Sequence, residues 1–475
     1  MGHERPERRL SSRRAFLATS ATAAAGASLL GQAPAVAEPA FGGPGRRVRP
    51  QRPDAELRAI LREFDARRMS AIVHRLAAFG TRHTLSAQDD PRRGIGAARD
   101  WIHRTMRRHA AASNGRMTVE LQSYLQPPAP RIPVPTRITN VIATLRGTGS
   151  SDRVYVVSGH YDSRVSDPLD ATSDAPGAGD DASGVAVVLE MARVLATREP
   201  EATLVFAAVA GEEQGLYGSR HMAERFTETG TDVQAMFTND IVGSSTAEDG
   251  TRDPRTVRLF AEGVPTAETP EEAEIRRAVG GENDSPPRQL ARFVRDVAEN
   301  RATGMSVRVI YRRDRYLRGG DHIPFLEQRY PAARFTEPAE NYAHQHQDVR
   351  VEDGVQYGDL PSFCDFGYIA RVAKVSAATL WSLAVAPGTP SGARIRTDRL
   401  TNDTDLLWQR GTEVDLAGYE VLWRETTSPE WTHVIDVGDV TEVTVPLSKD
   451  NVFFGVRAVD RSGHRSPVAF PTPLR

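Results

Sequence analysis

The stretch VYVVSGHYD (residues 154–162) gives the first indication of the fold, because four apolar residues run directly toward a histidine and an aspartate. Each of three apolar runs is followed by side chains that can act in catalysis or bind a metal. Run 154–157 precedes His160 and Asp162, run 204–209 precedes Glu212 and Glu213, and run 235–237 precedes Asp240. Short continuous apolar runs are typical of strands buried on both faces of a sheet. Because the carboxyl ends of strands in an open α/β sheet form the ligand crevice, we expect these side chains to converge.

The segments around these runs complete an α/β pattern. A stripe of apolar residues at helical spacing lies within 185–195, between the first two runs. Strands that alternate with helices predict a mixed, mostly parallel sheet with helices on both faces. Further strands are expected at 141–145 and 333–336, and further helices at 57–64, 97–106 and 369–383. The polar segment 245–318 is expected to form loops and short helices near the site.

An acidic loop, GAGDDASG (177–184), opens the predicted helix and adds Asp180 to the converging groups. Several carboxylates drawn together raise one another's pKa unless a cation neutralises them, and mixed histidine and carboxylate ligation suits zinc. One zinc ion needs three or four protein ligands, whereas the imidazole of His160, a second imidazole from the later segment with His344 and His346, and three carboxylates suit two ions that share a carboxylate. The sequence therefore predicts a centre with two metal ions.

Five motifs resemble those of the co-catalytic zinc exopeptidases, a family that includes secreted bacterial aminopeptidases, glutamate carboxypeptidases and glutaminyl cyclases. In chain order they are GHYDS (159–163), GAGDDASG (177–184), GEEQGLYGS (211–219), NDIVG (239–243) and YAHQHQD (342–348). The resemblance spans residues 140–385. It implies the zinc exopeptidase fold and the hydrolysis of peptide bonds.

The resemblance also implies roles for individual residues. It implies two zinc ions per chain, one held by His160, Asp180 and Asp240 and the other by Asp180, Glu213 and His344. Glu212 is then the general base: it takes a proton from a water that bridges the metals, the hydroxide attacks the scissile carbonyl, and Glu212 protonates the leaving amine. Asp162 is expected to accept the imidazole N–H of His160 and to fix its tautomer.

Two features depart from the family pattern. Glycine stands at position 179, where the family usually has Asn or Asp, so Asp180 is taken as the ligand by its place in the motif. The last motif holds two histidines, His344 and His346. We choose His344 because it precedes Asp348 by four residues, and His346 remains the alternative.

Three residues near the motifs are candidates for substrate contact: Asp321 and His322, in GGDHIPF (319–325), and Tyr342. The preferred function is an aminopeptidase that releases N-terminal residues from peptides, because secreted bacterial members of the family commonly have this activity. One alternative is a carboxypeptidase or a one-zinc glutaminyl cyclase of the same family, and Arg315 and Arg318 could grip a substrate carboxylate. Another is a non-catalytic adhesion or binding protein, against which the presence of Glu212 and Asp180 argues.

After Pro387 the helical pattern gives way to alternation of apolar and polar residues. Tyr419, Val421 and Trp423, and later Phe454 and Val456, mark the alternating strands of an all-β module. The module resembles a fibronectin type III sandwich. We therefore divide the chain into a catalytic domain at 53–387 and an all-β domain at 388–475. The β-module is expected to act as a spacer or to bind carbohydrate or cell-surface material.

Residues 1–37 have the features of a twin-arginine export signal: Arg13-Arg14 before Phe16-Leu17, an alanine-rich stretch, and Ala35-Val36-Ala37 as a cleavage site. Residues 38–52 are rich in Gly, Pro and Arg and predict a disordered lead-in. No other apolar run reaches the ~20 residues of a membrane span. We expect a secreted protein whose partner is a peptide substrate, with its oligomeric state left open.

The composition excludes several other classes. Hydrophobic residues make up 39% of the 475 positions and charged residues 26%, as in a globular protein, and the formal net charge is -2. Arginines alternate with acids instead of forming a basic stripe, so no nucleic-acid partner is expected. The single cysteine, Cys364, cannot form an internal disulfide, so stability must come from packing and metal.

Overall fold

The computed structural model describes residues 43–149 and 152–474. The predicted export signal, residues 1–37, lies outside these ranges. None of the described helices is long and apolar enough to cross a bilayer.

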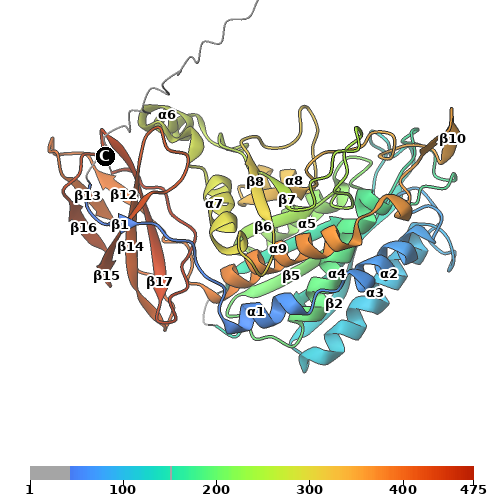
Figure 1. Cartoon of the computed structure of the whole chain (residues 1–475), viewed down its shortest axis with the longest axis horizontal. Helices are drawn as coiled ribbons and strands as arrows, with labels where there is room; N and C mark the ends of the chain where they lie inside the picture. Colours follow the sequence, from blue (N-terminus) through green and yellow to red (C-terminus); the bar gives the residue numbers. More distant parts are fainter. Residues whose placement is uncertain (1–42, 150–151, 475) are drawn as a thin grey trace, which may run out of the picture. The chain divides into compact units, whose positions relative to one another are not determined.

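An eight-stranded sheet, in the order β2-β3-β5-β4-β6-β9-β7-β8, forms the centre of the α/β region (Figure 1). Its strands are β2 (Met117–Gln126), β3 (Thr136–Leu145), β4 (Val154–His160), β5 (Thr203–Val209), β6 (Val233–Asn239), β7 (Thr256–Phe260), β8 (Ser306–Ile310) and β9 (Ala332–Thr336). Four of the seven pairings are parallel, so the predicted mixed and mostly parallel sheet is confirmed. Strand β4 is parallel to β5 and β6, and β6 is parallel to β9, so these four strands end at the same edge.

Helices cover both faces of the sheet (Figure 1). The larger layer holds α1 (Ala55–Arg62), α2 (Ala66–Ala77), α3 (Ile95–Ala110), α4 (Ser183–Leu195), α7 (Pro286–Ala298) and α9 (Phe366–Val385), and the other layer holds α5 (Tyr217–Glu228) and α8 (His322–Glu327). Tyr155 and Val157 of β4 belong to the core on the first side, and Val154 and Val156 to the core on the second. Because alternate strand residues point to opposite faces, β4 is buried on both, as its continuous apolar run predicted.

The segment 245–318 corrects one expectation. We expected loops and short helices, but it contains two strands of the main sheet, β7 and β8, and the 13-residue helix α7. A shorter helix, α6 (Pro270–Val279), buries none of its residues. In α7 the buried residues Leu290, Phe293, Val294 and Val297 recur at helical spacing, so the sequence does carry the apolar stripe of a helix, and our expectation for this segment overlooked it.

The C-terminal region contains two four-stranded sheets, in the orders β1-β15-β14-β17 and β16-β13-β12-β18. Their strands are β1 (Arg46–Arg47), β12 (Arg394–Arg396), β13 (Thr404–Leu407), β14 (Leu416–Glu425), β15 (His433–Gly438), β16 (Glu442–Val445), β17 (Val452–Asp460) and β18 (Thr472–Leu474). Trp408, Tyr419, Trp423 and Val456 belong to one buried cluster of this region. The assignment to the fibronectin type III fold stays a prediction.

Strand β1 corrects the expectation of a disordered lead-in at 38–52 for the part that is described. β1 pairs in an antiparallel manner with β15. The N–H of Val48 donates to the Thr432 carbonyl at 3.0 Å, and Nε1 of Trp423 donates to the Pro44 carbonyl at 2.8 Å. These contacts involve mainly backbone atoms. A sequence rich in Gly, Pro and Arg therefore forms an ordered strand here, although it lacks the apolar pattern from which a strand is predicted.

Candidate metal centre

The side chains predicted at strand ends lie at the shared edge of four parallel strands. His160 is the last residue of β4, Glu213 follows β5 and Asp240 directly follows β6. Asp180 lies in η2 (Ala178–Ala182), a short π-helical turn that leads into α4. The edge thus brings together residues that are far apart in the sequence, as the strand-end pattern predicted.

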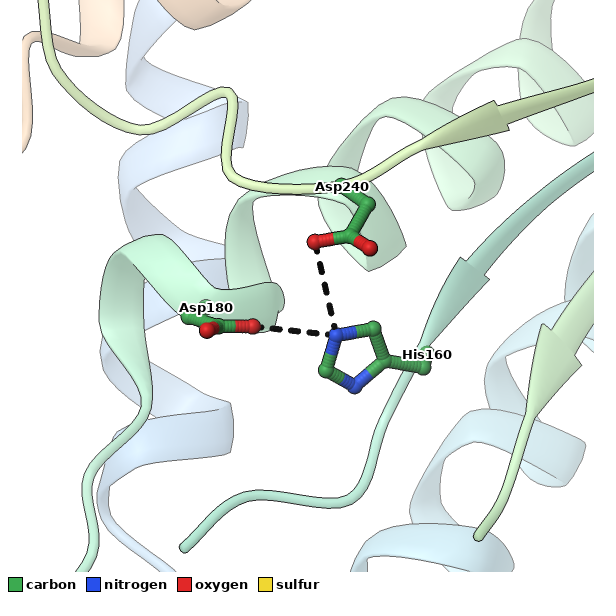
Figure 2. Close-up of side chains that lie close together, drawn as sticks. All are labelled: His160, Asp180 and Asp240. Carbon is green, nitrogen blue, oxygen red and sulfur yellow. Dashed lines mark ion pairs between the residues drawn. The ribbon is translucent and has the colours of Figure 1, made fainter. Parts of the chain in front are cut away.

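His160, Asp180 and Asp240 form one group whose nitrogen and oxygen atoms lie close enough to share a metal ion (Figure 2). Nε2 of His160 is 3.0 Å from Oδ1 of Asp180 and 3.7 Å from Oδ1 of Asp240. All three side chains are buried. Burial opposes the charged imidazole, but the carboxylates of Asp162, Asp180 and Asp240 outweigh it and raise the pKa of His160 well above its ordinary value. The group therefore carries negative charge that favours a cation.

A second group consists of Asp180, Glu213 and His346. Nε2 of His346 is 2.9 Å from Oδ2 of Asp180 and 3.0 Å from Oε1 of Glu213. Burial lowers the pKa of His346, but Glu213 and Asp180 together raise it to about 10. Asp180 belongs to both groups, with one carboxylate oxygen toward each histidine.

The structure brings His346, the alternative, to Asp180 and Glu213, and it does not bring the chosen His344 there. The ring of His344 stacks on Phe363, with 3.6 Å between ring centroids and an interplanar angle of 11°. His346 has a positive φ of 53°, which marks a turn in the loop. Two histidines two residues apart in an irregular loop follow no fixed period, so sequence spacing alone did not separate them.

Asp162 lies against the site but in a different role from the one we expected. Nδ1 of His160 is 3.2 Å from the main-chain oxygen of Asp162 and 3.6 Å from its carboxylate. The buried carboxylate instead accepts the backbone N–H groups of Glu212, at 3.3 Å, and Glu213, at 3.1 Å. Asp162 therefore orients the turn that presents both glutamates and holds His160 mainly through its backbone.

A pocket of about 590 Å³ opens beside the two groups. Glu212, Glu213, Asp180, Asp240 and His346 line it. Desolvation and the nearby carboxylates of Asp240 and Glu213 raise the pKa of Glu212 well above its ordinary value. A carboxyl group with a raised pKa in a pocket is suited to accept and return a proton.

Comparison with known proteins identifies the family. The model of peptidase family M28 matches residues 140–353, which include every residue of the two groups. A probable zinc metalloprotease of Leptosphaeria maculans is 56% identical over 426 residues, which cover 90% of this chain and 99% of that protein. A probable zinc metalloprotease of Pyrenophora tritici-repentis is 55% identical over 426 residues, which cover 89% of this chain and 88% of that protein. The chain belongs to peptidase family M28. The family that the five sequence motifs indicated is thereby confirmed.

Among solved structures, the LapA aminopeptidase of Legionella pneumophila is similar to this M28 chain with a TM-score of 0.49 and 18% sequence identity. The similarity covers 70% of this chain and 75% of that one.

Sequence reasoning missed two arginines that contact the centre of this M28 chain. Arg334, fully buried in β9, places Nη2 3.0 Å from Oδ1 of Asp240, and this partner lowers the pKa of Asp240 in spite of its burial. Nε of Arg164 donates to Oε2 of Glu213 at 3.0 Å, and its Nη2 is 2.7 Å from Nδ1 of His346. Arg334 could have been singled out from the sequence, because it is a charged residue within a predicted buried strand at 333–336. No comparable feature of the sequence singles out Arg164.

The three candidates for substrate contact in this M28 chain have different positions. Tyr342 lines the pocket and is 58% exposed, which is consistent with contact to a substrate. His322 is not available for such contact, because its ring is fully buried and its Nε2 donates to the Arg313 carbonyl at 2.8 Å. Asp321 is also fully buried, and this burial raises its pKa to about 7. Asp321 and His322 are therefore not placed to contact a substrate in the pocket, which neither of them lines.

Proposed function

We propose that this M28 chain is a zinc metallopeptidase that holds two ions and releases N-terminal residues from peptides. The observation that carries the proposal is the arrangement of Asp180. Its Oδ1 faces His160 and its Oδ2 faces His346, so one carboxylate belongs to two groups of potential ligands. A carboxylate shared in this way is the arrangement expected of a two-metal site.

The residues fit zinc on the chemistry of their donor atoms. Each group offers one imidazole nitrogen and two carboxylate oxygens, a set that suits zinc and leaves a position for water or substrate. Nε2 of His160 and Oε1 of Glu213 are buried, and each lies 3.0 Å from a member of its group without forming a hydrogen bond of normal geometry. Polar atoms are rarely buried in this state unless something else satisfies them. Both relatives reported above are named zinc metalloproteases, which supports the choice of metal.

The proposed reaction assigns a task to each residue of the pocket. When bound, the ions supply Lewis acidity, which polarises a peptide carbonyl and makes a water more acidic. Glu212 removes the proton from the attacking water and passes it to the amine that leaves. The carboxylate of Asp162 keeps Glu212 in place by accepting the backbone N–H of Glu212. Arg334 holds the carboxylate of Asp240, and Arg164, which lines the pocket, holds that of Glu213.

A carboxypeptidase is the second candidate, and one observation favours it. Four arginines line the same pocket: Arg131, Arg164, Arg315 and Arg318. Arg131 donates to the Glu213 carbonyl at 2.9 Å and Arg318 to Glu340 at 2.7 Å, each through Nη1. The remaining donors of these two guanidinium groups could bind a substrate carboxylate.

Metal content and a substrate panel test the proposal together. We expect two zinc ions per chain and cleavage of peptides with a free amino terminus. The variant E212Q should keep both ions and lose about 10²- to 10⁴-fold in kcat, because it cannot take the proton. E224Q, at an exposed position of α5, is the matched control and should behave as wild type. Cleavage only of N-blocked peptides with a free carboxylate would select the carboxypeptidase, and the absence of bound metal would reject the site.

We further propose that residues 1–37 direct export by the twin-arginine pathway and that residues 388–475 form a fibronectin type III-like domain. The twin arginines Arg13 and Arg14 and the small residues at 35–37 support the first proposal. The two four-stranded sheets support the second. Replacing both arginines by lysine should keep the protein in the cytoplasm of an expressing bacterium, as measured by cell fractionation.

A further inference from the structure

One residue outside the two ligand groups, Asp359, is bonded to the loop that carries Asp180. Oδ1 of Asp359 accepts the N–H of Gly179 at 2.7 Å, and Oδ2 accepts the N–H of Asp180 at 2.7 Å. The main-chain oxygen of Asp359 accepts the N–H of Ala178 at 3.2 Å. Asp359 thus receives three consecutive backbone N–H groups, one on its main-chain oxygen and one on each oxygen of its side chain.

The same short segment also holds the loop that carries His346. Asp359 follows the hairpin of β10 (Arg350–Glu352) and β11 (Val355–Tyr357), and the N–H of Gly358 donates to the Ala343 carbonyl at 3.2 Å. Gln345, beside His346, donates from Nε2 to Oδ2 of Asp180 at 3.0 Å. The loops of Asp180 and His346 are therefore fixed to each other through residues 358–359.

Because Gly179 has no side chain, the Asp359 carboxylate can lie directly against the backbone at this position. A Cβ at position 179 would lie 3.2 Å from Oδ1 of Asp359, closer than is usual for such contacts. On the other side of the loop, a Cβ at Gly243 would lie only 2.7 Å from Cα of Gly179. The loop is packed closely between the two, so it has little freedom to move away from the carboxylate.

We infer that Asp359 is a positioning residue of the metal centre, which fixes the Asp180 carboxylate between the two histidines. The inference rests on the proposed function, since it needs a metal to be bound there. Its physical basis is that Asp180 must present one oxygen to each ion, and the orientation of that carboxylate follows the backbone that Asp359 holds. Hydrogen bonds that orient ligands in this way commonly change metal affinity by about 10- to 100-fold.

Two variants disturb this contact by different routes. D359N removes the negative charge and leaves one oxygen acceptor for two N–H donors. G179A keeps the charge but moves the carboxylate, and its backbone is not in the left-handed region, so alanine is tolerated there. D365N is the matched control: Asp365 accepts the N–H of Tyr368 at 2.9 Å at the start of α9, and asparagine caps helices equally well.

Zinc affinity is measured by competition of Zn²⁺ between the full chain and a coloured chelator, with circular dichroism and thermal unfolding of the metal-free proteins alongside. We expect D359N and G179A to bind the weaker zinc ion about 10- to 100-fold less tightly, while D365N binds as wild type. With zinc in excess, kcat should recover in part and KM should stay within about twofold of wild type.

The outcomes separate the inference from the proposed function. Wild-type zinc affinity in D359N and G179A overturns the inference, and so does a lower unfolding midpoint of the metal-free variants without a change in affinity. If both variants are unfolded without metal, Asp359 is a general determinant of folding and the inference is rejected. A wild-type chain that binds no zinc rejects the proposed function itself, before any variant is compared.

Discussion

Asp240 and Asp180 show how two buried carboxylates of one site are stabilised differently. Asp240 is paired with Arg334, which is held in turn by Asp314 at 3.4 Å. Asp180 faces two imidazoles instead and receives Gln345 on one oxygen. The arginine contributes a fixed charge, whereas the imidazoles are neutral ligands once they bind a metal. Asp180 is therefore the member of the site whose environment depends most on the metal.

Replacing each of the two neighbouring histidines tests which one belongs to the centre. H346A should lose one zinc ion per chain and at least about 10²-fold in kcat/KM, because the second group is left with two carboxylates. H344A removes a ring that stacks on Phe363 and should keep both ions and most activity. Metal analysis of the dialysed proteins measures the difference. Loss of metal from H344A and retention in H346A would restore our original choice.

Residues at the ends of apolar strands could be predicted because the signal is local. His160 ends β4, Asp240 directly follows β6 and Glu213 lies in the turn after β5, and parallel strands place their ends together. Asp359 could not be predicted, since the turn Asp353-Gly354 indicates the hairpin before it but not that a residue after the hairpin packs against residues 178–180, far away in the sequence. His346 is an intermediate case: the motif at 342–348 predicted that this loop contributes a histidine, but it did not show which of its two histidines does so.

At the scale of the elements, most segments with continuous apolar runs or stripes were predicted, whereas α7, in spite of its apolar stripe, and β1 were not. Strands β3, β4, β5, β6 and β9 and helix α4 correspond to apolar runs or stripes. Strand β1 has two exposed arginines and no apolar pattern, and its existence depends on β15, far along the chain. Pairing between distant segments is set by tertiary structure, so single-sequence patterns do not predict it.

The extended segment around β1 gives a prediction about stability. V48P removes the N–H that donates to Thr432 and should lower the free energy of unfolding by about 1–2 kcal/mol, since one backbone hydrogen bond is lost. Proline suits the extended backbone of the residue before it, but V48P also removes the Val48 side chain, which packs against the buried cluster of Leu422, Trp431, Val434 and Val468. R49P is the control, at a neighbouring position. Denaturant unfolding compares the two, and equal midpoints would show that this segment does not stabilise the fold.

At the scale of the whole molecule, buried polar contacts connect α7 with the C-terminal sheets. Asp284, before α7, binds Arg424 of β14 at 2.6 Å and Arg292 at 3.0 Å. Nε1 of Trp431 donates to Oε1 of Gln289 at 2.9 Å. A charged network of this kind is costly to break on one side only, because the remaining partner is left buried and unpaired.

A pH dependence of stability is expected from His464, which follows β17. Its Nδ1 is 2.7 Å from Asp460 and its Nε2 is 3.2 Å from Asp54, the N-cap of α1. The hydrogen bond to Asp460 raises the pKa of His464 from 6.5 to about 9. A raised histidine pKa stabilises the folded state fully below pH 6.5, and this contribution is lost as the pH rises through 9.

The variant H464Q isolates this contribution. Wild type should exceed H464Q in free energy of unfolding by about 1–2 kcal/mol at pH 6, a value reduced for partial exposure, and the difference should vanish near pH 10. Urea unfolding of both proteins at the two pH values measures it. A difference that stays constant between these pH values would contradict the assigned pKa.

The pairing of β1 with β15 also defines how the chain is threaded. Residues before α1 form an edge of a C-terminal sheet, the chain then builds the whole α/β region, and it returns to complete the same sheet. In topological terms the metal-binding region is an insertion between the first two strands of a β-module. The first strand of that module must therefore wait for a partner that the ribosome adds much later, and contacts of such long sequence separation form slowly. The pairing of β1 with β15 can therefore form only after β15 has been synthesised.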